Sequence, residues 1–77
     1  MNYPLTTIDI HMNTKTSRIA KLPEVQHKTG LGRTSIYNKM ARGEFPKSIP
    51  IGARAVGWLE ADVDRWIAER IEAARRA

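Results

Sequence analysis

The 77-residue sequence contains no cysteine, which excludes disulfide bonds and thiolate metal sites. Its two histidines, His11 and His27, have no acidic residues or further histidines clustered around them at metal-ligand spacing, so we interpret both as surface residues. No apolar run approaches the roughly 20 residues of a membrane span, and the N-terminus lacks the basic and then apolar pattern of a signal peptide. The sequence therefore predicts a cytoplasmic protein with no membrane partner, no metal and no cofactor.

The sequence also lacks the residue sets on which common enzyme chemistries depend. It contains no Ser-His-Asp set, no paired carboxylates in an apolar setting and no phosphate-cradling loop. We therefore expect neither an enzyme nor a small-molecule substrate. Aromatic residues are few, and we expect most of them to be buried, whereas RNA-binding modules usually present aromatic stacking platforms. RNA binding is thus a less favoured interpretation; the aromatic residues are Tyr3, Tyr37, Phe45, Trp58 and Trp66.

The net charge of +5 is concentrated in one part of the chain. Residues 1–17 and residues 48–77 are each neutral, whereas residues 18–47 contain seven Lys or Arg against two Glu. A localised positive excess favours a polyanionic partner. A solvated face that keeps a small protein in solution explains the same charge equally well, so charge alone leaves both interpretations open. A protein-interaction module would fit a more neutral surface better.

Residues 1–17 show no sustained hydrophobic period and are rich in Thr, Asn and Ser, which predicts a disordered N-terminal arm. Met12 is a candidate alternative start, which would make residues 1–11 dispensable. Residues 18–77 are predicted to form one small domain. The domain begins with a short alternating or extended run, residues 18–22, that suits a first strand.

A first helix is predicted over residues 23–28. Pro23 loses no needed hydrogen bond at the first helical position, and Glu24 places negative charge at the positive end of the helix. Gly30 can adopt the left-handed conformation that ends a helix. Leu31, in the turn that follows, is predicted to be a buried plug that fixes the angle between this helix and the next.

A second helix is predicted over residues 33–42. It begins after Gly32, which is an acceptable but weaker N-cap than Ser or Asp, and it ends at Gly43. Ile36 and Met40 lie four residues apart and therefore share the face that points to the core. Two short helices joined by a glycine-containing turn form a helix-turn-helix.

Two short apolar runs, residues 48–51 and 55–58, are separated by a turn at residues 52–54 and predict a small β-hairpin. Pro50 restricts the first of these strands to an edge position. Residues 59–76 carry the strongest helix signal in the chain, with acidic residues in the first turns and arginines in the last. The predicted core stripe of this helix is Val63, Trp66, Ile67, Ile71 and Ala74.

The order of these elements resembles the AlpA family of small prophage and genomic-island regulators, which are relatives of MerR-type winged helices and phage excisionases. The resemblance covers residues 18–70. Two helix-capping positions, Gly32 and Ala61, depart from the Ser or Thr that members often have, which suggests softer helix starts. The resemblance rests on Thr29-Gly30-Leu31, Ser35-Ile36-Tyr37, Arg42-Gly43-Glu44-Phe45-Pro46-Lys47, Val56-Gly57-Trp58 and Val63-Asp64-Arg65-Trp66-Ile67.

The resemblance implies a mainly α fold with a small β-hairpin, a winged helix-turn-helix of the MerR-like and excisionase-like type. It implies a sequence-specific regulator of transcription that binds double-stranded DNA, cytoplasmic and associated with the nucleoid when bound. The alternative is an excisionase-like recombination directionality factor. An integrase, or other copies of the chain on DNA, are further candidate partners.

In this interpretation residues 33–42 form the recognition helix in the major groove and the hairpin at 47–58 forms the wing. Side chains near the start of a recognition helix commonly reach the bases, and cations further along reach phosphates. Tyr37 is ambiguous, and we favour packing as its main role. The candidate DNA-binding residues are Arg33, Thr34, Ser35, Tyr37, Asn38, Lys39, Arg42, Lys47 and Arg54.

Overall fold

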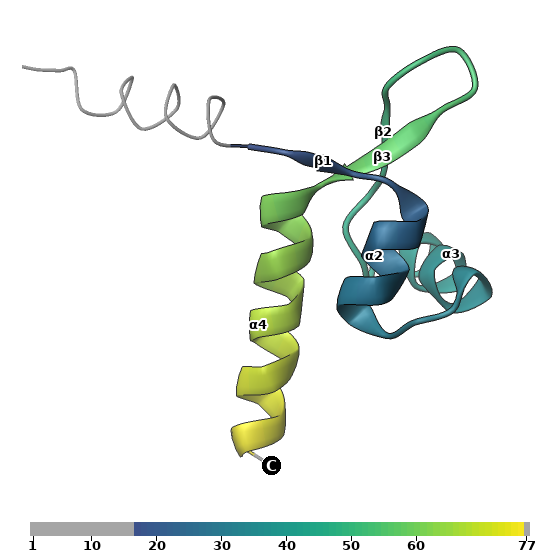
Figure 1. Cartoon of the computed structure of the whole chain (residues 1–77). Coiled ribbons are helices and arrows are strands. Elements are labelled where there is room, and N and C mark those ends of the chain that lie inside the picture. The colour runs from purple at the N-terminus through teal and green to yellow at the C-terminus, as the bar shows by residue number, and fades with distance from the viewer. Residues whose placement is uncertain (1–16, 77) are drawn as a thin grey trace, which may run out of the picture.

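The computed structural model describes residues 17–76, so the predicted disordered arm lies outside the described residues except for Ser17. The described residues form three helices and three short strands (Figure 1). This architecture confirms the predicted mainly α fold with a small hairpin. In chain order the elements are β1 (Ile19–Ala20), α2 (Leu22–Thr29), α3 (Arg33–Ala41), β2 (Ile49–Pro50), β3 (Val56–Leu59) and α4 (Glu60–Arg76).

The three strands form one antiparallel sheet in the order β1-β3-β2. The predicted hairpin is present as β2 and β3, and the Ile51 amide donates a hydrogen bond to the Ala55 carbonyl across its turn (2.9 Å). Pro50 lies on the edge strand β2, as its missing N–H group requires. The extended run before α2 pairs as β1 with the other side of β3, with Ala20 opposite Trp58.

Glycines end both short helices. Gly30 has φ 77° and donates its amide to the Gln26 carbonyl (2.8 Å), while Gly43 has φ 73° and donates to Met40 (3.0 Å). Gly32 precedes α3 in an extended conformation, and no side chain caps this helix start. The sequence-based bounds of α2 and α3 are therefore correct to within one residue.

The core lies where the sheet meets all three helices. Val25, Ile36, Trp58 and Val63 are fully buried, and Phe45 is nearly so. The predicted burial of Trp58 is therefore confirmed. Ala20 in β1 completes this buried hydrophobic cluster.

The two tryptophan side chains hold the segment that leaves α3. The Trp58 indole N–H donates to the Pro46 carbonyl (3.0 Å), and the Trp66 indole N–H donates to the Glu44 carbonyl (2.8 Å). Trp66 is half-buried and meets the Phe45 ring edge-on at a centroid distance of 5.0 Å. Each indole therefore satisfies its donor while its ring packs.

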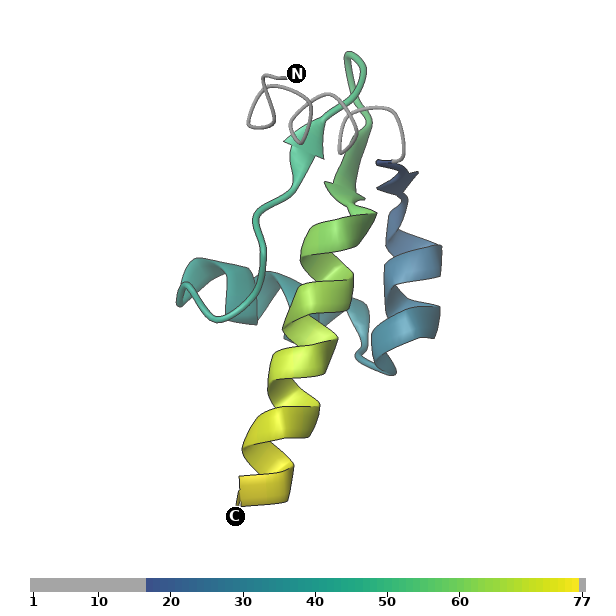
Figure 2. The same ribbon diagram turned by 90° about the vertical axis from the view of Figure 1, so that its left-hand side faces the viewer.

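Three predicted core positions are more exposed in the structure than expected. Leu31 is half-buried and packs against the core, so it is less enclosed than a plug would be. On α4, Val63 is buried and Trp66 is half-buried, but Ile71 is 47% exposed and Ala74 is exposed, so the prediction that they belong to the core was wrong. Figures 1 and 2 show the reason: the C-terminal part of α4 extends beyond the other elements and has nothing to pack against.

No helix among residues 17–76 is long and apolar enough to cross a membrane.

Candidate nucleic-acid interface

One face of α3 anchors the helix to the core, and the other face is polar and exposed. Ile36 is completely buried, and the half-buried Tyr37 ring meets Trp58 edge-on at a centroid distance of 6.2 Å. The predicted base-contacting residues all lie on the exposed side, in two neighbouring turns. They are Arg33, Thr34, Ser35 and Asn38.

Arg33 stacks on the ring of Tyr37. Its guanidinium carbon lies 5.3 Å from the ring centroid, within the range of a cation–π contact. Tyr37 therefore links the buried Trp58 to an exposed arginine at the start of α3, which fits the packing role favoured for it. The contact limits the directions in which the Arg33 side chain can extend and so orients its charge.

The C-terminal end of α3 carries Lys39, which is half-buried, and Arg42, which is exposed. The Lys39 carbonyl accepts hydrogen bonds from the amides of Arg42 (3.2 Å) and Glu44 (2.7 Å), which closes the helix end. The Arg42 Nε atom lies 3.3 Å from Glu44 Oε1. Both side chains of this pair are more than half exposed, so the pair is weak.

Two further predicted residues, Lys47 and Arg54, lie outside α3. Lys47 is exposed in the loop between α3 and β2, and Arg54 is exposed in the turn of the hairpin. Figure 1 shows α3 and the hairpin turn on the side of the molecule away from α4. Among residues 17–76, no hydrogen bond or ion pair joins these two residues to the predicted residues on α3.

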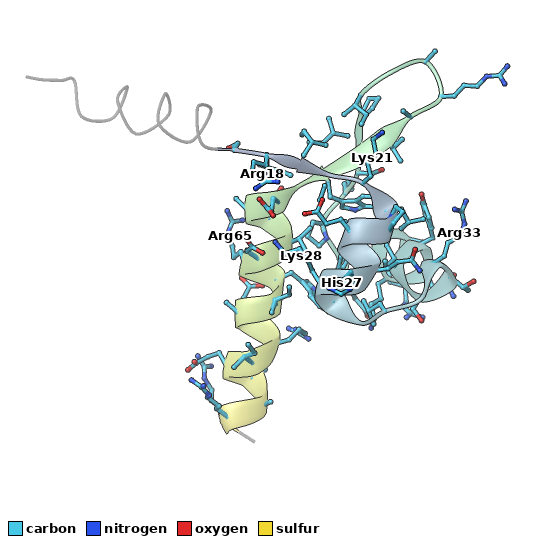
Figure 3. The ribbon with its side chains drawn as sticks, viewed as in Figure 1. Arg18, Lys21, His27, Lys28, Arg33 and Arg65 are labelled. Carbon is cyan, nitrogen blue, oxygen red and sulfur yellow. The ribbon has the colours of Figure 1, made fainter. Side chains whose placement is uncertain are left out.

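Not all of the basic residues in the charged third of the chain belong to this side. Lys28 Nζ lies 3.0 Å from Glu60 Oε2 and 2.6 Å from Asp64 Oδ1, and Arg18 Nε lies 3.7 Å from Glu60 Oε1. Hydrogen bonds to Asp64 and Glu60 raise the pKa of Lys28. Figure 3 shows Arg18, Lys28 and Arg65 beside α4, with Arg33 on the far side. The acidic start of α4 therefore neutralises part of the positive excess that the sequence count assigned to the interface.

Lys21 is a further exposed cation that the sequence analysis did not select. It occupies the N-cap position of α2, and in Figure 3 it lies at the top of α2, below the hairpin. Within the part of the chain that the structure describes, Lys21 forms no ion pair. The sequence feature that could have indicated it is Pro23, which marks the start of α2 and so places Lys21 at the N-cap position.

The described residues contain no group of three or more His, Asp or Glu side chains that could hold a metal ion. The features that bear on ligand binding at the candidate interface are therefore its exposed hydrogen-bonding side chains and its cations.

Comparisons with known proteins match most of the chain. Residues 18–71 match the model of a protein family described as prophage CP4-57 regulatory protein (AlpA). The DNA-binding transcriptional activator AlpA of Escherichia coli (strain K12) is 41% identical, over 77% of this chain and 94% of AlpA. An uncharacterized protein of Enterobacteria phage P4, ORF88, is also 41% identical, over 77% of this chain and 67% of ORF88. The family match spans β1 to residue 71, in the second half of α4, and therefore includes α3 and the hairpin.

Proposed function

Because the chain belongs to the AlpA family of prophage regulatory proteins, we propose that it is a sequence-specific DNA-binding regulator of transcription. The observation that carries the proposal is the exposed polar face of α3, held from behind by Ile36 and Tyr37. A helix anchored in this way can enter the major groove as a rigid unit. The proposed role is non-enzymatic and is exerted in the cytoplasm, where the DNA is.

Base recognition in this proposal comes from the first turns of α3. Asn38 suits a bidentate contact with adenine, and Arg33 suits a bidentate contact with guanine. Thr34 and Ser35 are short enough to contact bases or phosphates at the same depth. The stacking of Arg33 on Tyr37 supports its assignment, because a side chain that is already oriented loses less conformational entropy on binding.

Phosphate contacts in this proposal come from cations around that helix. Lys39 and Arg42 lie at the end of α3, Lys47 lies in the following loop, and Arg54 lies at the tip of the hairpin, which acts as a wing. Lys21 adds a cation at the N-terminus of α2. Such contacts fix the orientation of the protein on the duplex without carrying sequence information.

A single recognition helix contacts few base pairs, so we propose that several copies bind adjacent sites or that an integrase binds beside them. The same interface serves the alternative role of an excisionase-like directionality factor. Footprinting on the DNA around the gene for this protein separates the two roles. Protection at a promoter supports transcriptional control, and protection at the arms of an attachment site supports the alternative.

Mutation of Asn38 tests base recognition. Asn38→Ala is expected to reduce the preference for the protected site over random duplex by about 1–3 kcal/mol, because one bidentate base contact is lost. Fluorescence anisotropy with both duplexes measures this preference. An equal loss of affinity on the two duplexes would contradict a base-contacting role for Asn38.

Mutation of Arg54 tests the wing. Arg54→Ala is expected to weaken binding to all duplexes alike and to lower the slope of log K against log salt by about 1. The matched control is Arg75→Ala, which removes an exposed arginine from the far end of α4. If both variants change the slope equally, or neither does, the wing is not a phosphate contact. Absence of duplex binding by the unmodified protein would refute the proposed function itself.

A further inference from the structure

One edge of the sheet is blocked by a proline. The strand order is β1-β3-β2, so β1 and β2 are the edge strands. On β2, Ile51 donates its amide to the Ala55 carbonyl, which makes these two residues a hydrogen-bonded pair. Hydrogen-bonded and non-hydrogen-bonded pairs alternate along an antiparallel ladder. Pro50, opposite Val56, therefore turns its backbone to the outer edge, where its missing N–H group offers no donor to a further strand.

The other edge of the sheet, along β1, is open. The Glu60 amide donates to the Arg18 carbonyl (2.7 Å), so these two residues form a hydrogen-bonded pair at the start of the β1–β3 ladder. By the same alternation, the N–H and C=O groups of Ile19 point away from β3. Within residues 17–76, Ile19 therefore presents an unpaired backbone donor and an unpaired acceptor to a further strand.

The outer face of the sheet beside this open edge is apolar. Ile19 is 44% exposed, Ile49 is 37% exposed and Ile51 is 40% exposed. Successive residues of a strand alternate between its faces, and directly paired residues share a face. Since Trp58 is buried, its neighbour Gly57 faces outward, and so does Ile49, which pairs with Gly57. A Cβ atom on Gly57 would meet Ile19 Cγ2 and, at 3.4 Å, Ile51 Cδ1, so these side chains converge over the central strand. We call Ile19, Ile49 and Ile51 the outer patch.

The charged residues of the sheet itself are all positive. In the two segments that contain its strands, residues 17–23 and 45–59, every charged residue is Lys or Arg. Arg18 and Lys21 are exposed, one at each end of β1 (Figure 3). The Arg18 contact with Glu60 is 3.7 Å long and 73% of the Arg18 side chain is exposed, so this pair is weak. A segment that lies along β1 therefore passes both cations.

We propose that β1 accepts an additional strand from a partner protein, an extended segment in which apolar and acidic residues alternate. In strand addition, backbone hydrogen bonds supply affinity and alternate side chains supply specificity. The segment pairs with the backbone of Ile19, and its apolar side chains extend the outer patch. Its acidic side chains lie next to Arg18 and Lys21. The proposal concerns the free protein and does not rest on DNA binding.

Two other occupants match the open edge less well. Phosphates of a nucleic acid satisfy Arg18 and Lys21, but they only accept hydrogen bonds from these cations, so the Ile19 carbonyl and the outer patch gain no partner. A second copy that pairs edge to edge brings the cations of two β1 strands together, and like charges on adjacent strands are destabilising. An acidic protein segment satisfies the backbone, the apolar face and the charge together.

Amide hydrogen exchange, measured by NMR on the full chain, reports strand addition directly. The probe is a synthetic peptide in which Glu and Ile alternate. The Ile19 amide points to the open edge and is expected to exchange rapidly in the free protein and to become protected when the peptide is added. The Ala20 amide points to β3 and is the internal control, protected in both samples. Failure of the peptide to protect Ile19, or protection of Ile19 before the peptide is added, would overturn the proposal.

Two control peptides separate strand addition from general attraction. One has the same composition with all Glu before all Ile, so that it lacks the alternation. The other alternates Lys and Ile, so that like charges face Arg18 and Lys21. Each is expected to bind about tenfold more weakly than the probe. Equal binding of all three peptides would overturn the proposal. So would duplex DNA or anionic vesicles that shift the methyl signals of the outer patch where the probe does not.

Two double variants test the charges of the edge. Arg18→Gln with Lys21→Gln removes the cations at the ends of β1 and is expected to weaken binding of the probe about tenfold at low salt. Arg75→Gln with Arg76→Gln removes the same charge from the far end of α4 and is expected to leave binding unchanged. Equal effects of the two double variants would show that only net charge attracts the probe, which contradicts the proposal.

Discussion

Substitution of Gly57 by alanine is expected to destabilise the protein through the sheet. Gly57 is buried in the central strand β3, and its backbone conformation suits any residue, so only the added methyl group matters. That methyl group would overlap Ile19 Cγ2 and would lie 3.2 Å from the Ala20 carbonyl oxygen. Ile19 Cγ2 is attached directly to a β-branched carbon and cannot swing away as the end of a long side chain can. The β1–β3 pairing must therefore shift.

The size of the effect follows from measured costs of overpacking. Forcing one extra methyl group into a packed site costs about 1–3 kcal/mol. In a domain of 60–100 residues each kcal/mol lowers the melting temperature by about 4–8 °C. We therefore expect Gly57→Ala to melt about 4–24 °C below the unmodified protein. This is a large loss, because a domain of this length has a free energy of unfolding of only a few kcal/mol.

Urea unfolding measures the loss of stability, with circular dichroism and tryptophan fluorescence as the signals. A double-mutant cycle with Ile19→Ala tests whether the overlap with Ile19 causes that loss. Ile19→Ala removes the atom that the new methyl group would overlap. It is expected to recover part of the stability in the Gly57→Ala background, where the Ala20 carbonyl remains close. Gly52→Ala is the control, because its Cβ would make only an ordinary 3.6 Å contact with Ala55. Additive effects of the first two substitutions, or equal stability of the two glycine variants, would refute the reasoning.

Two further predictions concern the helix start and the ion-pair cluster. Gly32→Ser should stabilise α3 by a few tenths of a kcal/mol, because serine can cap a helix that no side chain caps and no atom obstructs its Cβ. An unchanged urea midpoint would contradict this. Lys28→Met should cost about 1 kcal/mol at neutral pH. The Lys28 pKa is raised above its usual 10.5, so its stabilisation is complete below that pH and lost as pH rises through the raised value. The stability difference between the two proteins should therefore shrink above pH 10.5; a constant difference would exclude Lys28 ionisation as its source.

Features with local causes were predictable from the sequence. The positive φ angles of Gly30 and Gly43 follow from the place of each glycine after a helical segment. The edge position of Pro50 follows from its missing amide hydrogen. The exposed polar side of α3 follows from the spacing of Ile36 and Met40. In each case the decisive residues lie within a few positions of one another, so the pattern contains the information.

Features with long-range causes were not predictable in the same way. The ion pair of Lys28 with Glu60 joins residues 32 positions apart, and the sequence count therefore included the Lys28 charge in the positive excess that we propose to face DNA. The periodicity of α4 continues to Ile71, but the body of the protein does not extend that far along the helix. A hydrophobic period shows which residues share a face. It does not show how much of that face packs against other elements.

The residues that identify the family have mainly structural roles. Both tryptophan indoles donate to carbonyls of the segment that follows α3, at Glu44 and Pro46, and Phe45 of the same segment packs against Trp66 of α4. Together these contacts fix the end of α3 relative to the sheet and α4. The exposed side chains of α3 make none of these contacts, so they can change without loss of the fold. We therefore expect relatives that share this framework to differ in the exposed residues of α3 and in the DNA sequence that they bind.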